Sequence, residues 1–268
     1  ASGHIRGAGA GKSTLIELLG LHLVEQGRRV AVLAIDPSSP RSGGSILGDK
    51  TRMERLSSSS GAFVRPSPSG TRAGGVAWAT REAILLCEAA DYDVVIVETV
   101  GAGQNEVAAA SMTDMLVVLQ PPHGGDGLQA VKRGWMEMAD RVVISKADID
   151  AAAAAKAQVE IAGVLAAVRL SAPAIVSFSA VGDTALSSVH ALWEHIESIH
   201  DERARNGDRL ARRTEQNLAW MWDRIESGLM ERFRARTEVA SQLPTIADEV
   251  RAGRMTASDA ARRLLDLA

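Results

Sequence analysis

Apolar residues recur along most of the chain in two alternating patterns. One has the three- and four-residue spacing of a helix, as in residues 13–26, where Gly27 marks a C-terminal stop. The other is a short continuous apolar run, as in residues 30–35, which is typical of a strand buried on both faces of a parallel sheet. Further runs predict strands at 94–97, 115–119, 141–144 and 174–178, and helical spacing predicts helices at 80–90, 128–138 and 151–169. This alternation predicts an α/β domain with a doubly wound, mostly parallel sheet.

Two segments depart from the alternation. Residues 37–75 are rich in Ser, Gly, Pro and Arg, with a short apolar island at 62–64, and a loop of that length is usually functional. After residue 199 the strand signals stop, and long charged helical patterns follow. One of them carries an apolar stripe, made of Leu218, Met221, Ile225, Leu229 and Phe233. We therefore place a boundary near residue 200, between a domain of residues 1–200 and a helical arm of residues 201–268.

Composition and charge narrow the function classes. Of the 268 residues, 46% are hydrophobic and 24% charged, which is enough apolar material for a folded core. The formal net charge of −3 gives no basic field, which argues against a general binder of nucleic acid or of an anionic membrane. The single cysteine, Cys87, excludes an intrachain disulfide. With neither a signal peptide pattern nor an apolar run of membrane-spanning length, we expect a cytoplasmic protein.

The strongest motif is the glycine-rich segment GAGAGKST, residues 7–14, at the head of the first predicted helix. It has the pattern of the end of a P-loop, in which backbone N–H groups surround phosphates. Lys12 would reach the β and γ phosphates and Ser13 would bind Mg²⁺ through its hydroxyl, whereas the alternative is a simple helix-capping turn. The predicted nucleotide-binding residues of this motif are Gly9, Ala10, Gly11, Lys12, Ser13 and Thr14.

The P-loop pattern has one defect. The full motif requires glycine where this chain has Arg6, and residues 2–5 make a poor first strand. A sheet of this class without its first strand would have a hole at its centre. The alternatives are that this loop departs from the motif or that a few residues, the first strand among them, are missing from this sequence, and we expect the second.

Acidic residues at strand ends provide candidate Mg²⁺ ligands. Glu98 directly follows the apolar run 94–97, and a carboxylate in that place holds Mg²⁺ or its water shell beside a P-loop. Asp36 ends the preceding predicted strand, and Asp49 lies in the long loop. The alternatives are an Asx turn before Pro37 for Asp36 and a helix cap for Asp49.

The tetrapeptide Ser145–Asp148 follows the predicted strand 141–144 and indicates which base is bound. A carboxylate at Asp148 accepts hydrogen bonds from guanine N1–H and N2–H₂, a donor pair that adenine lacks, and Lys146 would lie along the base. Ser145 stands where most GTPases have Asn, and a plain strand-end turn is the alternative. Ser179 and Ala180, after the last predicted strand, are candidates to offer a backbone N–H to guanine O6.

Several stretches together resemble the MeaB family of methylmalonyl-CoA-mutase-associated GTPases, also called ArgK. They are residues 36–39, 43–53, 65–68, 98–104 and 145–148. The resemblance implies a P-loop GTPase domain that uses GTP or GDP and Mg²⁺, and switch segments within 37–75, 98–106 and 120–132. It further implies an additional helical segment before the P-loop and a homodimer formed through the C-terminal helices.

The same resemblance implies a partner, an adenosylcobalamin-dependent acyl-CoA mutase. The GTPase would gate cofactor loading and protect or reactivate the mutase, whose substrate, methylmalonyl-CoA or isobutyryl-CoA, the sequence leaves open. Gln104 is the candidate to orient the attacking water, and with Lys12 and Glu98 it completes the predicted catalytic set. We expect the protein alone to hydrolyse GTP slowly and the mutase to increase the rate. A kinase or ATPase linked to amino-acid transport, as the name ArgK suggests, and an adaptor that binds nucleotide without hydrolysis are the alternatives.

Overall fold

The computed structural model describes residues 2–6, 11–36, 53–68, 75–99, 105–123, 138–168, 174–182 and 184–267. The chain divides into two units, Ala1–Arg212 and Arg213–Ala268, which are described separately. This division lies beyond the boundary placed near residue 200, because residues on both sides of that point belong to one continuous helix, α8 (Thr184–Asn206).

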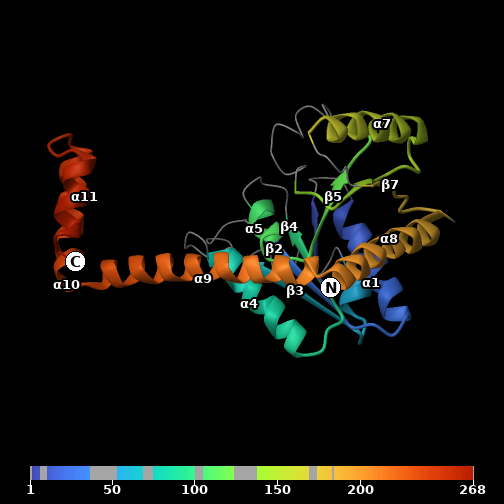
Figure 1. The fold of residues 1–268 in the computed structure, drawn as a ribbon, viewed down its shortest axis with the longest axis horizontal. Helices are drawn as coiled ribbons and strands as arrows, with labels where there is room; N and C mark the ends of the chain where they lie inside the picture. The colour runs from blue at the N-terminus through green and yellow to red at the C-terminus, as the bar shows by residue number, and fades with distance from the viewer. Residues whose placement is uncertain are drawn as a thin grey trace. The chain divides into compact units, whose positions relative to one another are not determined.

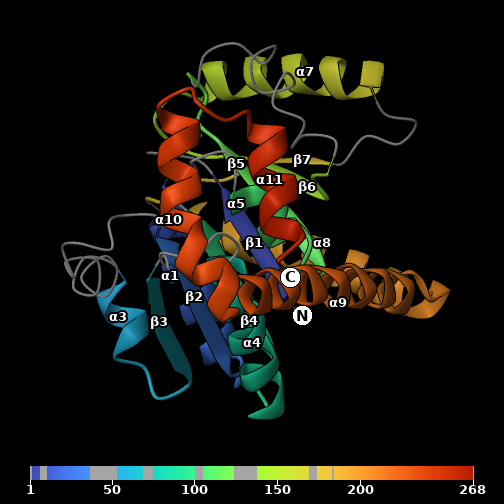
Figure 2. The ribbon, with the colours of Figure 1, turned by 90° about the vertical axis from the view of Figure 1, so that its left-hand side faces the viewer.

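The first unit is built on a seven-stranded sheet in which every described strand pair is parallel. Its strand order is β3-β2-β4-β1-β5-β6-β7, and the strands lie side by side (Figure 2). The strands are β1 (Ser2–Arg6), β2 (Val30–Asp36), β3 (Ala62–Pro68), β4 (Val94–Thr99), β5 (Met115–Gln120), β6 (Arg141–Ile144) and β7 (Ile175–Ser177). Parallel strands all end at the same edge of a sheet, so every loop that follows a strand here opens at one edge.

The helices of the first unit surround this sheet (Figure 1). They are α1 (Lys12–Glu25), α3 (Glu54–Ser57), α4 (Gly75–Ala89), α5 (Asn105–Ala110), α7 (Ala151–Val168), α8 and the start of α9 (Asp208–Ala235). Val30 and Val32 of β2 pack into a core with α1 and α8, whereas Ala31 and Leu33 pack with α4 and α5 on the opposite face. Helices thus cover both faces, which confirms the predicted doubly wound α/β fold.

Two strands were not expected from the sequence. Ser2–Arg6 forms β1 at the sheet centre, paired with β4 on one side and β5 on the other, so the expectation that the first strand is missing is wrong. Backbone pairing on both sides makes this a strand although its sequence carries little apolar signal. The supposed loop 37–75 contains α3 and the edge strand β3, where Pro66 and Pro68 are tolerated because only one side is paired.

The second unit comprises the rest of α9 together with α10 (Thr237–Arg251) and α11 (Ala257–Leu265). Val239 and Ile246 of α10 and Ala260 of α11 are buried, whereas α9 has no buried residue. Among the helices that the structure describes, none is long and apolar enough to cross a membrane.

Candidate functional site

The end of the P-loop is placed where β1 leads into α1. Gly11 immediately precedes α1 in the left-handed conformation, with φ of 77°, and its carbonyl accepts a hydrogen bond from the Leu15 N–H at 2.9 Å. The N-cap offers no side-chain hydrogen bond, and the first turn of α1 contains no acidic residue. A helix N-terminus with these properties favours an anion such as phosphate. Gly9 and Ala10 lie outside the described residues.

Strand register brings Glu98 to the same place. Glu98 lies opposite Ile5 of β1 and Ala34 of β2, near the carboxyl end of the sheet from which the P-loop departs. The Ser13 hydroxyl donates a hydrogen bond to Glu98 Oε1 at 3.3 Å, across 85 residues of sequence. Glu98 is only 6% exposed. The structure therefore joins two of the four residues that the sequence proposed as Mg²⁺ ligands.

A hydroxyl oxygen and a carboxylate oxygen are the kind of donors that Mg²⁺ uses in nucleotide sites, so this pair fits that ion. Lys12 and Thr14 flank Ser13 on the first turn of α1, and Lys12 is 8% exposed. The nearly buried ammonium group of Lys12 and the N-terminus of α1 both attract the negative charge of a polyphosphate.

Three other residues were predicted to bind Mg²⁺ or the attacking water. Asp36 ends β2, one residue beyond the Ile35–Thr99 pair, but its side chain is not among those described. Asp49 and Gln104 lie outside the described residues altogether. The roles of all three stay predictions.

The predicted base-binding loop forms a tight turn after β6. Ser145 is 2% exposed, and its backbone N–H donates to the Gln120 carbonyl at 2.9 Å, which ties the turn to the end of β5. Lys146 adopts a left-handed conformation with φ of 58°, uncommon for a residue with a side chain, and its carbonyl accepts from the Ile149 N–H at 3.1 Å. Such strain persists only where surrounding contacts enforce it, and it clusters at functional sites.

The segment after β7 is bonded to this turn. The Phe178 N–H donates to the Ile144 carbonyl at 2.7 Å, and the Ala147 N–H donates to the Phe178 carbonyl at 3.2 Å. The Ala180 N–H donates to Asp148 Oδ1 at 3.3 Å, while the Ser179 N–H donates to the Ser188 hydroxyl at 3.4 Å. Asp148 and Ala180, both predicted to contact guanine, are therefore adjacent, and the amide expected to face O6 is here used by Asp148.

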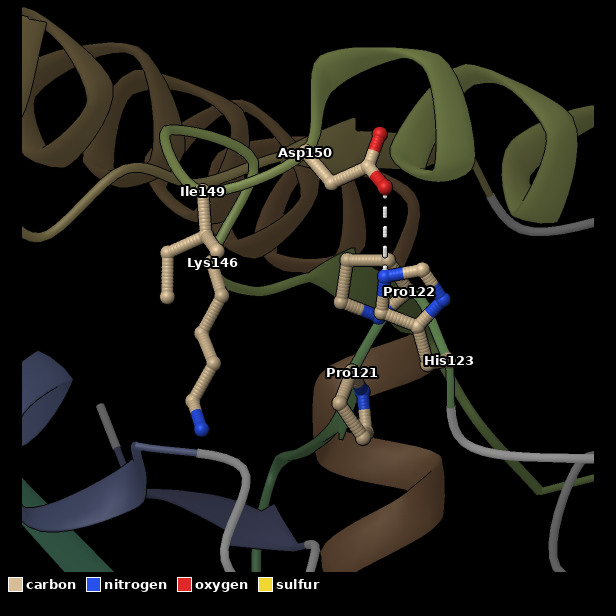
Figure 3. Close-up of a pocket in the computed structure, with 6 residues that line it drawn as sticks. All are labelled: Pro121, Pro122, His123, Lys146, Ile149 and Asp150. Atoms are coloured by element: carbon tan, nitrogen blue, oxygen red, sulfur yellow. Dashed lines mark ion pairs between the residues drawn. The ribbon is translucent and has the colours of Figure 1, made fainter.

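A cavity of about 240 Å³ lies beside this loop (Figure 3). Its lining residues are Pro121, Pro122, His123, Lys146, Ile149 and Asp150. His123 Nε2 lies 3.2 Å from Asp150 Oδ2. Sequence reasoning missed this pair, because a single histidine in a Pro-Gly loop has the pattern of a solvated side chain.

The comparisons with known proteins identify the family. The model of a family described as "Methylmalonyl Co-A mutase-associated GTPase MeaB" matches residues 3–238. The chain belongs to the MeaB family. It is accordingly a P-loop GTPase, an enzyme that hydrolyses GTP, as the resemblance implied.

Individual relatives agree with this assignment to the MeaB family. The chain is 43% identical over 262 residues to the "Methylmalonic aciduria type A homolog, mitochondrial" of Mus musculus, covering 96% of this chain and 62% of the mouse protein. It is 57% identical over 142 residues to "GTPase ArgK" of Escherichia coli, covering 53% of this chain and 43% of that protein. A solved structure described as "Crystal structure of LAO/AO transport system kinase" is 30% identical, with a TM-score of 0.71, and covers 99% of this chain and 80% of that one.

Proposed function

We propose that this MeaB-family GTPase is a nucleotide-dependent switch for an adenosylcobalamin-dependent acyl-CoA mutase, gating cofactor loading and protecting or reactivating the mutase. The family description and the name of the mouse relative support a connection with methylmalonyl-CoA metabolism. The observation that carries the switch is the hydrogen bond between Ser13 and Glu98, because it joins the P-loop helix to the end of β4. The chain leaving β4 enters residues 98–106, the proposed second switch.

In this proposal the nucleotide phosphates bind at the head of α1. Lys12 and the backbone N–H groups of residues 9–13 contact the phosphate oxygens, and the positive end of the α1 dipole adds to their attraction. Ser13 and Glu98, with Asp36 and Asp49, would hold Mg²⁺, which when bound neutralises charge on the phosphate oxygens. Gln104 would orient the water.

Guanine is held at the other end of the site. The Asp148 carboxylate is exposed, and its position is fixed by the hydrogen bond from Ala180. It would accept from guanine N1–H and N2–H₂, while the Lys146 side chain lies along the base. Ser145 supplies no side-chain amide to the base, so guanine recognition rests on Asp148.

Single-turnover hydrolysis of GTP, with and without a purified cobalamin-dependent mutase, tests the proposal. We expect the protein to hydrolyse GTP slowly by itself and faster when the mutase is present. Ser13→Ala and Glu98→Gln should abolish GTP hydrolysis in both conditions. Ser57→Ala is the matched control, because the Ser57 hydroxyl donates to the Glu54 carbonyl on the exposed side of α3. No response to any cobalamin-dependent mutase would contradict the switch role, and no hydrolysis in either condition would favour the adaptor.

A kinase linked to amino-acid transport is the second candidate, favoured by the likeness to the solved structure described as a LAO/AO transport system kinase. It predicts transfer of the γ-phosphate to a protein or amino acid rather than to water. GTP labelled at the γ-phosphate distinguishes the two candidates. Free phosphate as the sole labelled product supports the GTPase switch, whereas a labelled protein or amino acid supports the kinase.

We further propose that the protein forms a homodimer through its C-terminal helices. Within α9, Leu218, Met221, Ile225 and Leu229 repeat at helical spacing and are each at least 40% exposed in the single chain. An apolar stripe of this length is stabilised by burial against a partner, and a second copy of the same helix offers a complementary stripe.

Light scattering at micromolar concentration tests the dimer. We expect twice the chain mass, reduced to the mass of one chain by Leu229→Glu with GDP binding retained. Ser227→Glu is the control, because Ser227 is exposed on the opposite side of α9 from the stripe. A single-chain mass for the unaltered protein would contradict the proposal.

A further inference from the structure

The ion pair between His123 and Asp150 joins two segments of the first unit that are distant in sequence. His123 lies three residues beyond the end of β5, and Asp150 lies immediately before the start of α7. Figure 3 shows the two side chains pointing toward one another, with the ion pair between them. Asp150 is two residues from Asp148, so the pair is anchored at the base of the guanine loop.

Asp150 is held in place from a second side. Its Oδ1 accepts a hydrogen bond from the Ala153 N–H at 2.9 Å, which caps the N-terminus of α7, while Oδ2 faces His123. One carboxylate therefore connects the helix, the guanine loop and the chain leaving β5. Breaking the contact between His123 and Asp150 would therefore free one side of the guanine loop.

We propose that His123 is a positioning residue, whose ion pair with Asp150 latches the chain leaving β5 onto the guanine loop and slows nucleotide release. The inference rests on the proposed function, in that Asp148 holds the base. His123 itself does not touch the nucleotide. It acts by restricting the turn of residues 145–150, in which Lys146 already occupies a strained backbone conformation.

Two positive features lie near the pair, the Lys146 side chain and the N-terminus of α7. Of the described residues lining the cavity, Lys146 is the other charged one, and Figure 3 shows its ammonium group pointing away from the pair. The N-terminus of α7 also opposes a positive imidazole, and Asp150, which caps that terminus, lies between the two.

The expected effect is modest because the pair is partly solvated. The His123 side chain is 71% exposed and that of Asp150 is 39% exposed. Exposed ion pairs of this kind contribute little, which corresponds to about a two- to five-fold change in a rate. Removing the latch should therefore accelerate release of a fluorescent GDP analogue about two- to five-fold.

The experiment compares release of the fluorescent GDP analogue from the unaltered protein, His123→Ala, Asp150→Asn and the double variant. Asparagine keeps the cap on α7, so Asp150→Asn removes the charge and leaves the helix start. The double variant should release GDP no faster than either single variant. The control is His190→Ala, which breaks an exposed histidine–carboxylate pair on α8, to Glu194 at 3.6 Å.

The outcomes separate the latch from the proposed function. Equally faster release from the two single variants and the double variant, absent from His190→Ala, supports the latch. Unchanged release from the single variants, or additive effects in the double variant, overturn it while GDP binding stands. If the unaltered protein fails to bind GDP, the proposed function is overturned, and the latch with it.

Discussion

A nearly buried carboxylate, Asp140, fixes the end of α8 and the start of α9 to the sheet, and its loss should be measurable. Its side chain is 6% exposed; Oδ1 lies 2.5 Å from Arg203 Nη2, and Oδ2 accepts from the Leu116 N–H at 2.7 Å. Arg203 Nη1 also donates to the Asp114 carbonyl at 3.1 Å, and Arg212 Nη1 lies 3.7 Å from Asp140 Oδ2. Arg203→Met keeps most of the stem and removes both charged hydrogen bonds.

The magnitude follows from what the variant leaves behind. Breaking a buried ion pair costs about 3–5 kcal/mol when the remaining charge has no other partner. Asp140 keeps Arg212 and the Leu116 N–H, so we expect Arg203→Met to lower the free energy of unfolding by about 2–3 kcal/mol.

Urea unfolding followed by circular dichroism provides the assay. A slope of about 1–3 kcal/mol per molar urea converts this loss into a midpoint shift of about 1 M. The control is Lys156→Met, which breaks a pair with Glu160 whose side chains are 77% and 56% exposed, and should change stability by less than about 0.5 kcal/mol. Equal midpoint shifts for the two variants would refute the reasoning.

Four further predictions concern single positions. Gly11→Ala should weaken GDP binding in calorimetry by about 1–2 kcal/mol, because the left-handed backbone at Gly11 disfavours any Cβ. Gly20→Ala should lower the free energy of unfolding in urea by about 1–3 kcal/mol, because the added Cβ would lie 2.6 Å from Cδ2 of the fully buried Leu56. Gly163→Ala on α7 should raise it by about 0.5–1 kcal/mol, because no atom lies within 4 Å of the added Cβ. Burial lowers the pKa of His200, so the unfolded chain binds a proton on this side chain more readily than the folded chain does. The contribution of His200 to stability is therefore complete above about pH 6.5 and is lost as the pH falls below that value. His200→Gln should reduce this dependence of stability on pH, measured by urea unfolding at pH 5 and pH 7.5.

Local sequence signals predicted the elements that carry strong burial. The run at β4 is buried at every position, and its carboxylate Glu98 was assigned from its place at the strand end alone. The apolar signal failed for β1 and β3, whose strands are defined by backbone pairing. β1 is a strand because of its two neighbours, and β3 is an edge strand with exposed Phe63 and Arg65.

Contacts between distant residues were beyond the sequence for a different reason. The pairing of His123 with Asp150 depends on where the loop after β5 turns, and the pairing of Arg203 with Asp140 depends on how α8 runs past the sheet. In the sequence, all four residues are of the same types as ordinary solvated charged side chains. Only the fold brings the two members of each pair within bonding distance.

Selective binding of guanine nucleotides tests the central claim most directly. Calorimetry with Mg²⁺ should show GDP binding and no measurable ADP binding to the unaltered protein. Asp148→Asn should lose about 1–3 kcal/mol of GDP affinity and shift preference toward the xanthine nucleotide, whose base offers an acceptor where guanine has a donor. Equal affinity of the unaltered protein for GDP and ADP would contradict the account.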